Sequence, residues 1–259
     1  LPLLNPVDIA EQVATIDHIS EGRFILGLGL GYRPEEFEAF GTSLKHRAAR
    51  NSEALELMIR LWTEDEVTHH GRFFDVSNAR PTARTYQKPH PKIWLAAMSD
   101  PAVRRVGREG HTLFIGPAQS YEVTKRHIDI YREELDRNGH PPPEDIVLLR
   151  EFFCANSRTE ALEKASAGFQ RKYEVYGAHG FQGSNDELAD IVTGDIETQT
   201  DSAFVIGSPQ DCIEELARYR DLGVTQVAMR LYYPGMSQKE THEHIELVGR
   251  EVLPELHRW

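Results

Sequence analysis

Short apolar runs alternate with amphipathic segments along most of this chain of 259 residues, and this alternation limits the fold more than any other feature. The run from Phe24 to Leu30 is almost continuously apolar, which is typical of a strand buried on both faces of a parallel sheet. Buried strands that alternate with helical segments predict a parallel α/β fold. We predict five strands, at residues 24–30, 92–98, 112–115, 146–154 and 226–232.

The helical segments fit this architecture but do not settle how the sheet closes. The chain begins with a predicted helix from Val7 to Ile19, and its expected buried stripe is Ile9, Val13, Ile16 and Ile19. A (β/α)8 barrel needs eight strands and about 250 residues. The length therefore permits a barrel, whereas five strands do not distinguish a barrel from a doubly wound sheet.

Two stretches depart from the alternation. Residues 67–86 contain alternating apolar positions between turn residues, which predicts a hairpin-like excursion. Residues 159–192 have helical character but are interrupted by Gly177, Gly180 and Gly183, as expected either of a mobile insertion near a site or of a plain surface connection. We find no internal repeat and no linker, so we predict one domain over residues 1–259.

Charge and composition exclude several classes of partner. A net charge of −12 argues against a nucleic-acid partner and against docking on anionic lipid. No apolar run approaches the roughly 20 residues of a membrane span. Cys154 and Cys212 lie in apolar segments without a CxxC motif, so we expect two reduced core thiols and a cytoplasmic location. The paired His69 and His70, and likewise His242 and His244, lack a completing carboxylate, so no metal site is predicted.

The glycine-rich run from Gly27 to Gly31 has two possible structural explanations. It is not a dinucleotide-binding loop, because Tyr32 stands where that fingerprint needs its last glycine. Glycines on a strand let a flat ring lie against the backbone, where a side chain would block it. Close packing inside a barrel would explain them equally well.

Two further features mark candidate ligand contacts. The segment Met98 to Pro101 ends a predicted strand and starts a helix, so Ser99 and the free N–H groups of the first turn form an anion site, unless Ser99 or Asp100 is only an N-cap. Arg230 is a single charge inside the apolar strand from Val227 to Leu231. Such a charge is either a ligand contact or part of a buried ion pair.

The order and spacing of several short segments carry a family resemblance over essentially the whole chain. They are residues 21–24, 27–31, 36–41, 47–53 with Leu61-Trp62, 71–74, 89–94, and the ending from Pro234-Gly235-Met236 to Leu253-Pro254. Together they resemble luciferase-like flavin-dependent oxidoreductases. The resemblance implies a (β/α)8 barrel with the cofactor at the carboxyl ends of the strands. It also implies that three strands precede the helix beginning near Pro6, so we expect this chain to be a portion of a longer one.

The resemblance also implies site residues. The cofactor-phosphate contact falls on Met98 and Ser99, and Leu28 and Gly29 flank the ring. Arg47 lies in a segment that approaches the phosphate in several members of the family. Its neighbour Ala48 stands where some monooxygenases carry a tyrosine, which weakens any expectation of long-chain alkane or sulfonate chemistry. The family's active-site histidine lies on an early strand outside this sequence, so no catalytic residue is predicted.

For function, the resemblance implies a monooxygenase that uses non-covalent reduced FMN, oxygen and a small organic substrate, with Arg230 as a candidate substrate contact. A separate flavin reductase and a homodimer are the expected partners. The first alternative is an F420-dependent oxidoreductase that transfers hydride. The second is a flavin-binding protein of the same fold that does not turn over.

Overall fold

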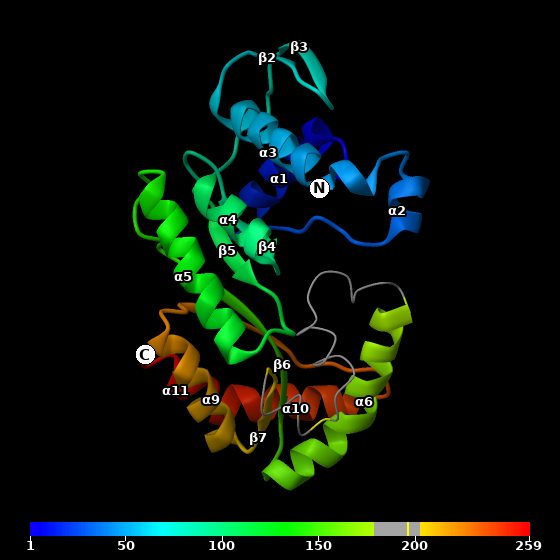
Figure 1. The fold of residues 1–259 in the computed structure, drawn as a ribbon, viewed down its shortest axis with the longest axis vertical. Helices are drawn as coiled ribbons and strands as arrows, with labels where there is room; N and C mark the ends of the chain where they lie inside the picture. The colour runs from blue at the N-terminus through cyan, green and yellow to red at the C-terminus, as the bar shows by residue number, and fades with distance from the viewer. Residues whose placement is uncertain (179–195, 197–202) are drawn as a thin grey trace. The chain divides into compact units, whose positions relative to one another are not determined.

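The computed structural model describes residues 1–178, 196 and 203–259. It divides into two compact units, Leu1–Ala96 and Ala97–Trp259, and each is described by itself (Figure 1). The predicted helical stretch is confirmed up to Ala178, and its glycines at positions 180 and 183 lie outside the described residues.

The first unit contains a pair of parallel strands and a separate hairpin. Strand β1 pairs with β4 in parallel, with Ile25 opposite Lys92 and Leu28 opposite Leu95. In chain order its elements are α1 (Pro6–Ile19), β1 (Ile25–Leu28), α2 (Pro34–Ala39), a 3-10 turn (Leu44–His46), α3 (Arg47–Thr63), β2 (Val67–His70), β3 (Asp75–Ala79) and β4 (Lys92–Ala97).

Helix α1 forms where the sequence predicts it, but its expected buried stripe is partly wrong. Its buried residues are Pro6, Ala10, Val13, Ala14 and Asp17, whereas Ile16 is 43% and Ile19 76% exposed. The Ala10 carbonyl accepts a 3.0 Å hydrogen bond from the Trp62 indole of α3. The Asp17 carboxylate accepts hydrogen bonds from the backbone and side-chain amides of Gln87, at 2.8 and 2.7 Å. Small residues and these polar partners, rather than the largest apolar residues, therefore select the buried face.

Strand β1 is shorter and less covered than its apolar sequence predicts. Leu26 is buried, but Ile25 is 38% exposed and Gly27 is exposed. The expectation of burial on both faces is therefore wrong for this strand, because the described residues cover only the face that carries Leu26.

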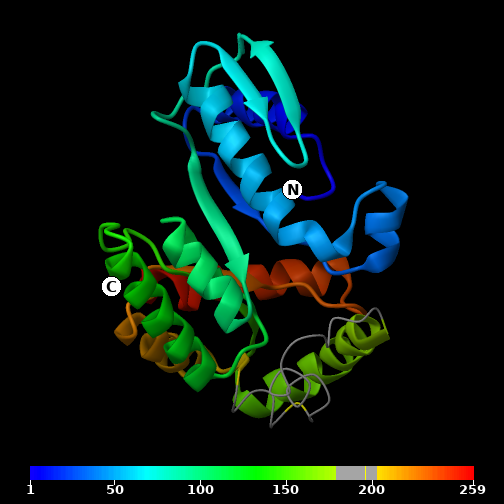
Figure 2. The same cartoon turned by 45° about the horizontal axis from the view of Figure 1, so that its top comes forward.

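The predicted excursion is an antiparallel hairpin of β2 and β3, which lies beside α3 (Figure 2). Its turn is held by Glu53 of α3. The Glu53 carboxylate accepts hydrogen bonds from three successive backbone N–H groups, those of Arg72 (3.1 Å), Phe73 (2.9 Å) and Phe74 (2.9 Å).

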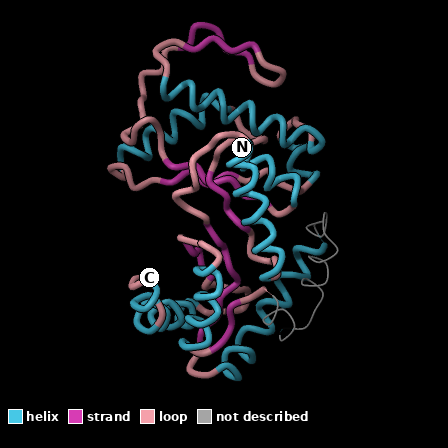
Figure 3. The backbone as a smooth tube through the Cα atoms, turned by 60° about the vertical axis from the view of Figure 1, so that its left-hand side comes forward, coloured by secondary structure: helices cyan, strands magenta, loops and turns pink. Residues whose placement is uncertain are grey.

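The second unit is built around β6. Its strands are parallel: β5 and β8 pair with β6, and β7 pairs with the last part of β6 (Figure 3). In chain order its elements are α4 (Asp100–Arg108), β5 (Thr112–Ile115), α5 (Tyr121–Arg137), β6 (Val147–Cys154), α6 (Arg158–Ala178), β7 (Val205–Gly207), α9 (Pro209–Asp221), β8 (Gln226–Arg230), α10 (Gln238–Glu251) and α11 (Leu253–Leu256).

Strand β6 changes partner along its length. Residues 147–151 pair with 226–230 of β8, and residues 152–154 pair with 205–207 of β7. Both faces of β6 are covered. Phe152 and Cys154 pack in one apolar cluster with Cys212 and Leu216 of α9, while Phe153 packs in a second cluster that includes Phe169 of α6. All five predicted strands are thus confirmed, with shorter bounds for four of them, and β7 is an additional strand that is not among those five.

Within the ranges that the structure describes, every helix is too short or too polar to cross a bilayer.

Candidate functional site

Ser99 stands at the N-cap position of α4, two residues after the end of β4. Its backbone is extended, with φ −143° and ψ 152°, and its hydroxyl makes no capping hydrogen bond. Ser120, Ser208 and Ser237 differ, because each accepts a hydrogen bond from a backbone N–H of the helix it begins. Ser99 is therefore the N-cap residue of α4 by position, but its hydroxyl does not cap the helix. Helix geometry also leaves the first-turn N–H groups of α4 without intrahelical acceptors.

The acidic residue in that first turn is engaged elsewhere. The Asp100 carboxylate accepts a 3.0 Å hydrogen bond from Nε2 of the fully buried His127 on α5, and Arg126 Nε lies 3.4 Å from the same oxygen. These contacts offset the negative charge of Asp100. The start of α4 therefore remains compatible with an anionic group at Ser99.

Met98 lies against Gly116, the residue that follows β5. A Cβ added to Gly116 would come within 3.0 Å of Met98 Sδ, so the glycine makes room for this side chain. Met98 also packs at the edge of the cluster that contains Phe153.

In the first unit, Leu28 ends β1 and Gly29 follows it. A Cβ built on Gly27 or Gly29 would meet no described atom within 4 Å, so close packing does not explain either glycine in this part of the chain. Gly31 is different, because its φ of +73° favours glycine and its Cβ position lies 3.2 Å from Phe37. The space beside Gly27 and Gly29 fits a flat ring, which stays a prediction.

Arg47 is the first residue of α3, and its backbone N–H donates to the Leu44 carbonyl, but its side chain makes no hydrogen bond with any described residue. The other two members of its motif have structural partners. Arg50 Nε donates to the Pro2 carbonyl at 2.8 Å and its guanidinium stacks on Phe74, while Glu53 holds the hairpin. Arg47 is therefore the member of the motif that is free to bind a ligand. The structure describes Leu28, Gly29 and Arg47 in the first unit and Met98, Ser99 and Arg230 in the second.

Arg230 belongs to a buried charge cluster that also contains Glu151 of β6 and Lys172 of α6. Arg230 Nη1 lies 2.9 Å from Glu151 Oε1, and Lys172 Nζ lies 2.5 and 2.6 Å from the two carboxylate oxygens. Tyr173 donates its hydroxyl hydrogen to the same carboxylate at 3.0 Å. The Glu151 side chain is fully buried, whereas that of Arg230 is 32% exposed. Arg230 thus forms the ion pair expected in one alternative, while part of its side chain stays accessible.

Burial and charge shape the protonation of this cluster. Burial lowers the pKa of Lys172 to about 8, Glu151 opposes that shift, and Arg230 adds to it. Burial raises the pKa of Tyr173 and of Tyr233 well above the usual value, and the Glu151 charge raises both further. Both phenols are therefore neutral hydrogen-bonding groups at physiological pH.

The sequence-based prediction missed Glu151 and Lys172. Glu151 gave a usable signal, because it is an acidic residue inside the apolar run from Val147 to Cys154. Lys172 gave none, because it lies between Arg171 and Tyr173 on a helix with many charged residues.

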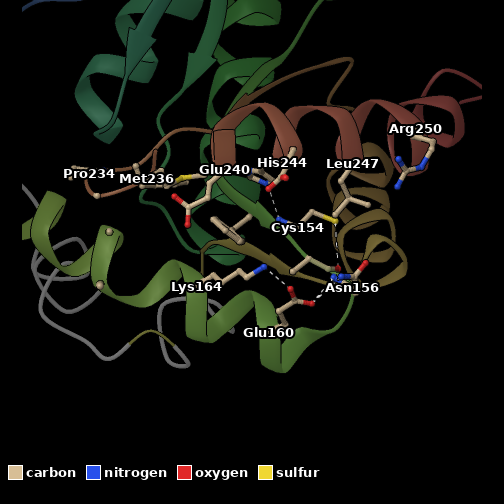
Figure 4. Close-up of a pocket in the computed structure, with 17 residues that line it drawn as sticks. Cys154, Asn156, Glu160, Lys164, Pro234, Met236, Glu240, His244, Leu247 and Arg250 are labelled. Atoms are coloured by element: carbon tan, nitrogen blue, oxygen red, sulfur yellow. Dashed lines mark hydrogen bonds and ion pairs between the residues drawn. The ribbon is translucent and has the colours of Figure 1, made fainter. Parts of the chain in front are cut away.

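A pocket of about 430 Å³ lies where the end of β6 meets α6 and α10, and several of its lining residues are close in sequence to members of this cluster (Figure 4). Polar side chains that line this pocket already have hydrogen-bond partners within the protein. Glu160 bonds to Lys164 at 2.5 Å and to the Asn156 side chain at 3.1 Å, and His244 Nε2 accepts the backbone N–H of Cys154. We therefore regard the Glu151 cluster and the Ser99 region, rather than this pocket, as the candidate functional residues.

Comparison with known proteins gives consistent matches. Residues 1–226 match the family described as luciferase-like monooxygenase. The FMNH2-dependent dimethylsulfone monooxygenase of Pseudomonas putida is 26% identical over 267 residues, which cover 96% of this chain and 70% of that protein. The F420-dependent glucose-6-phosphate dehydrogenase of Amycolatopsis mediterranei is 26% identical over 263 residues, with coverage of 97% and 75%.

Among solved structures, monooxygenase RslO1 of Streptomyces bottropensis superposes with a TM-score of 0.82 at 24% identity, covering 98% of this chain and 75% of that one. Such structural neighbours confirm the predicted fold, the luciferase-like (β/α)8 barrel. The family match confirms the resemblance seen in the sequence. The chain belongs to the luciferase-like monooxygenase family.

Proposed function

We propose that this chain is the oxygenase component of a two-component flavin-dependent monooxygenase. It would bind reduced FMN non-covalently, receive it from a separate flavin reductase, and act on a small organic substrate. The observation that carries the proposal is the uncapped Ser99 hydroxyl at the end of a parallel strand, beside the first-turn N–H groups of α4. One FMNH2-dependent relative and one F420-dependent relative are each 26% identical to this chain. Sequence identity therefore does not distinguish the two cofactors, and a binding experiment has to assign one.

The residues present fit a flavin. In the second unit, Ser99 and the α4 amides offer donors for a phosphate. In the first unit, considered by itself, the Arg47 side chain is an unengaged cation and the space beside Gly27 and Gly29 suits a flat ring. When bound, reduced FMN would supply the electrons and the reactivity toward oxygen. Within the second unit, Ser99 would hold the phosphate and Arg230 would orient the substrate. Met98, which packs beside Gly116, would exclude water from the bound cofactor.

Titration separates this proposal from its closest alternative. Purified protein would be titrated with FMN, with reduced FMN under anaerobic conditions, and with F420, and ring fluorescence or absorbance would be followed. Tighter binding of reduced FMN than of F420, and oxygen-dependent product in the presence of NADH and a flavin reductase, support the oxygenase. Tighter binding of F420 assigns the chain to hydride transfer instead. Flavin binding without product from a broad substrate panel supports a binding protein without turnover.

The remaining parts of the proposal are a single domain over residues 1–259, a homodimer and a cytoplasmic location. Two buried cysteines without a disulfide support a reducing compartment. Light scattering coupled to size-exclusion chromatography tests the dimer directly.

A further inference from the structure

We propose that Lys172 and Arg230, held in place by Glu151, form a subsite for an oxyanion group of a small ligand, such as a carboxylate, sulfonate or phosphate. The proposal rests on the proposed function insofar as the ligand is the enzyme's substrate. It assigns a chemical class to the substrate, which the proposed function describes only as a small organic molecule.

The cluster contains more cations than carboxylates. Two cations share one carboxylate, because Glu151 is the acidic partner of both Lys172 and Arg230 among the described residues. Glu151 is fully buried and the Lys172 side chain is only 11% exposed. The cluster therefore carries a surplus positive charge, and its ammonium group is largely buried. An uncompensated buried charge is costly, and an anionic ligand that pairs with it relieves that cost.

Lys172 and Arg230 keep hydrogen-bond donors that Glu151 does not use. Arg230 uses Nη1 toward Glu151 and toward the Tyr176 hydroxyl at 3.4 Å, and no described residue accepts from its Nη2 or Nε. Lys172 directs two hydrogen bonds to Glu151, so one of its three donors remains. A guanidinium edge with a nearby ammonium is the arrangement that recognises planar or tetrahedral oxyanions.

The cluster lies at the carboxyl end of β8 and is held in place by the surrounding backbone. Glu151 and Arg230 are register partners on β6 and β8, so their side chains leave the same face of the sheet. Arg230 is the last residue of β8, and ligands of parallel α/β folds bind at the carboxyl ends of the strands. Tyr233 fixes the backbone here, because its hydroxyl donates to the Arg230 carbonyl at 2.7 Å and accepts the Phe152 N–H at 2.9 Å.

The pKa of Lys172, which burial lowers to about 8, supports the same function. The titratable and charged groups that face its ammonium are Glu151 of β6, Arg230 of β8, Tyr173 and Tyr176 of α6, and Tyr233 after β8. Lys172 loses its proton as the pH rises through about 8. Oxyanion affinity should therefore fall between pH 7 and pH 9.

The test compares charged probes with neutral probes of the same shape. Calorimetric titration without cofactor would use benzoate against benzamide, benzenesulfonate against benzenesulfonamide, and inorganic phosphate. The expected result is binding of at least one anion and no binding of its neutral partner. Lys172→Met and Arg230→Met should each weaken that binding about tenfold or more. Lys164→Met is the matched control, because Lys164 is an exposed lysine of the same helix that pairs with Glu160, and it should leave binding unchanged.

One further variant and one further pair of ligands distinguish the possible outcomes. Arg230→Lys retains the charge but loses the guanidinium edge, so it should fold and still bind more weakly. FMN and riboflavin titrated on the same variants separate the two sources of an oxyanion. If only FMN affinity falls in the variants, the subsite holds the cofactor phosphate and the substrate assignment is overturned. Equal binding of charged and neutral probes, or no effect of either variant, overturns the subsite itself. Because these titrations need no turnover, an inactive oxygenase with intact oxyanion binding would count against the proposed function alone.

Discussion

Nε2 of His244 accepts a 2.9 Å hydrogen bond from the backbone N–H of Cys154. The other ring nitrogen, Nδ1, lies 3.0 Å from the Leu231 carbonyl. An N–H needs an unprotonated acceptor and a carbonyl needs a donor, so these partners select the neutral imidazole with its hydrogen on Nδ1. Strand β8 ends at Arg230, and β6 continues to Cys154. The imidazole therefore connects β6 to the chain just beyond β8 with hydrogen bonds that a strand would otherwise make.

We predict that this contact makes stability fall in mild acid. Burial lowers the pKa of His244, and its hydrogen bond to Leu231 only partly opposes that shift. The unfolded chain then takes up a proton on His244 at a higher pH than the folded chain does. The stabilisation is complete above the ordinary histidine pKa of about 6.5 and is lost as the pH falls toward the lower folded value. Urea unfolding at several pH values between 8 and 5 measures it.

The matched variant is His244→Phe, which keeps a planar ring but leaves the Cys154 N–H and the Leu231 carbonyl without these partners. It should lower the free energy of unfolding by about 2 kcal/mol or more at pH 8 and should flatten the acid dependence. His242→Phe, two residues earlier on the exposed side of α10, is the control. An unchanged acid dependence in His244→Phe would show that other groups cause it.

Glu53 should contribute stability that is lost only at lower pH. Burial by itself raises the pKa of its carboxyl, but hydrogen bonds from Phe73, Phe74, His69 and Arg72 outweigh burial and bring the pKa below its ordinary value of 4.5. The contribution is therefore present above about pH 4.5 and disappears as the pH falls through the folded pKa. Glu53→Ala should cost about 2 kcal/mol or more at pH 7 in urea unfolding, because three hairpin N–H groups lose their acceptor. Glu56→Ala, on the exposed face of the same helix, should cost little; equal losses in the two variants would contradict this role.

The strands could be predicted because their signal is local. Each of the five is an apolar run bounded by turn residues or by a helix start, and no tertiary partner has to be known to see it. The buried face of α1 could not be predicted in the same way. It depends on Trp62 and Gln87, which lie far along the chain, so a stripe of isoleucines pointed to the wrong face.

The candidate site shows the same division. Arg230 was visible in the sequence as a charge in an apolar strand. Its pairing with Glu151 follows from the register of β6 and β8, and Lys172 reaches the pair from a helix, so neither contact has a sequence signal of its own. The sequence left open whether Ser99 contacts an anion or only caps α4. The observed geometry is needed to show that its hydroxyl does not cap the helix.

The two cysteines should react very slowly with thiol reagents while the protein is folded. Cys154 is 2% exposed and Cys212 is fully buried. A hydrogen bond from the Cys212 thiol lowers the pKa of Cys154, and the same contact together with burial raises the pKa of Cys212. Access, rather than pKa, should therefore limit reaction with a thiol reagent. Labelling with an aromatic disulfide should be about a thousandfold slower in buffer than in urea, because a typical unfolded fraction is of order 10⁻³ or less. Fast labelling of either thiol in buffer would show that the apolar cluster opens locally.

Ser99 and Ser237 should respond in opposite ways to loss of their hydroxyls. Ser237 completes a capping box with Glu240, so Ser237→Ala should lower the free energy of unfolding by about 1 kcal/mol and leave flavin affinity unchanged. Ser99 caps nothing, so Ser99→Ala should leave stability nearly unchanged and weaken FMN binding by about 1 kcal/mol or more if its hydroxyl donates to the phosphate. Riboflavin, which lacks the phosphate, should bind Ser99→Ala and the parent protein equally well. Thermal unfolding and fluorescence titration of both variants measure the two effects in parallel. A loss of riboflavin affinity equal to the loss of FMN affinity would place Ser99 beside the ring or would indicate a general disturbance of α4, and in either case the phosphate contact would be wrong.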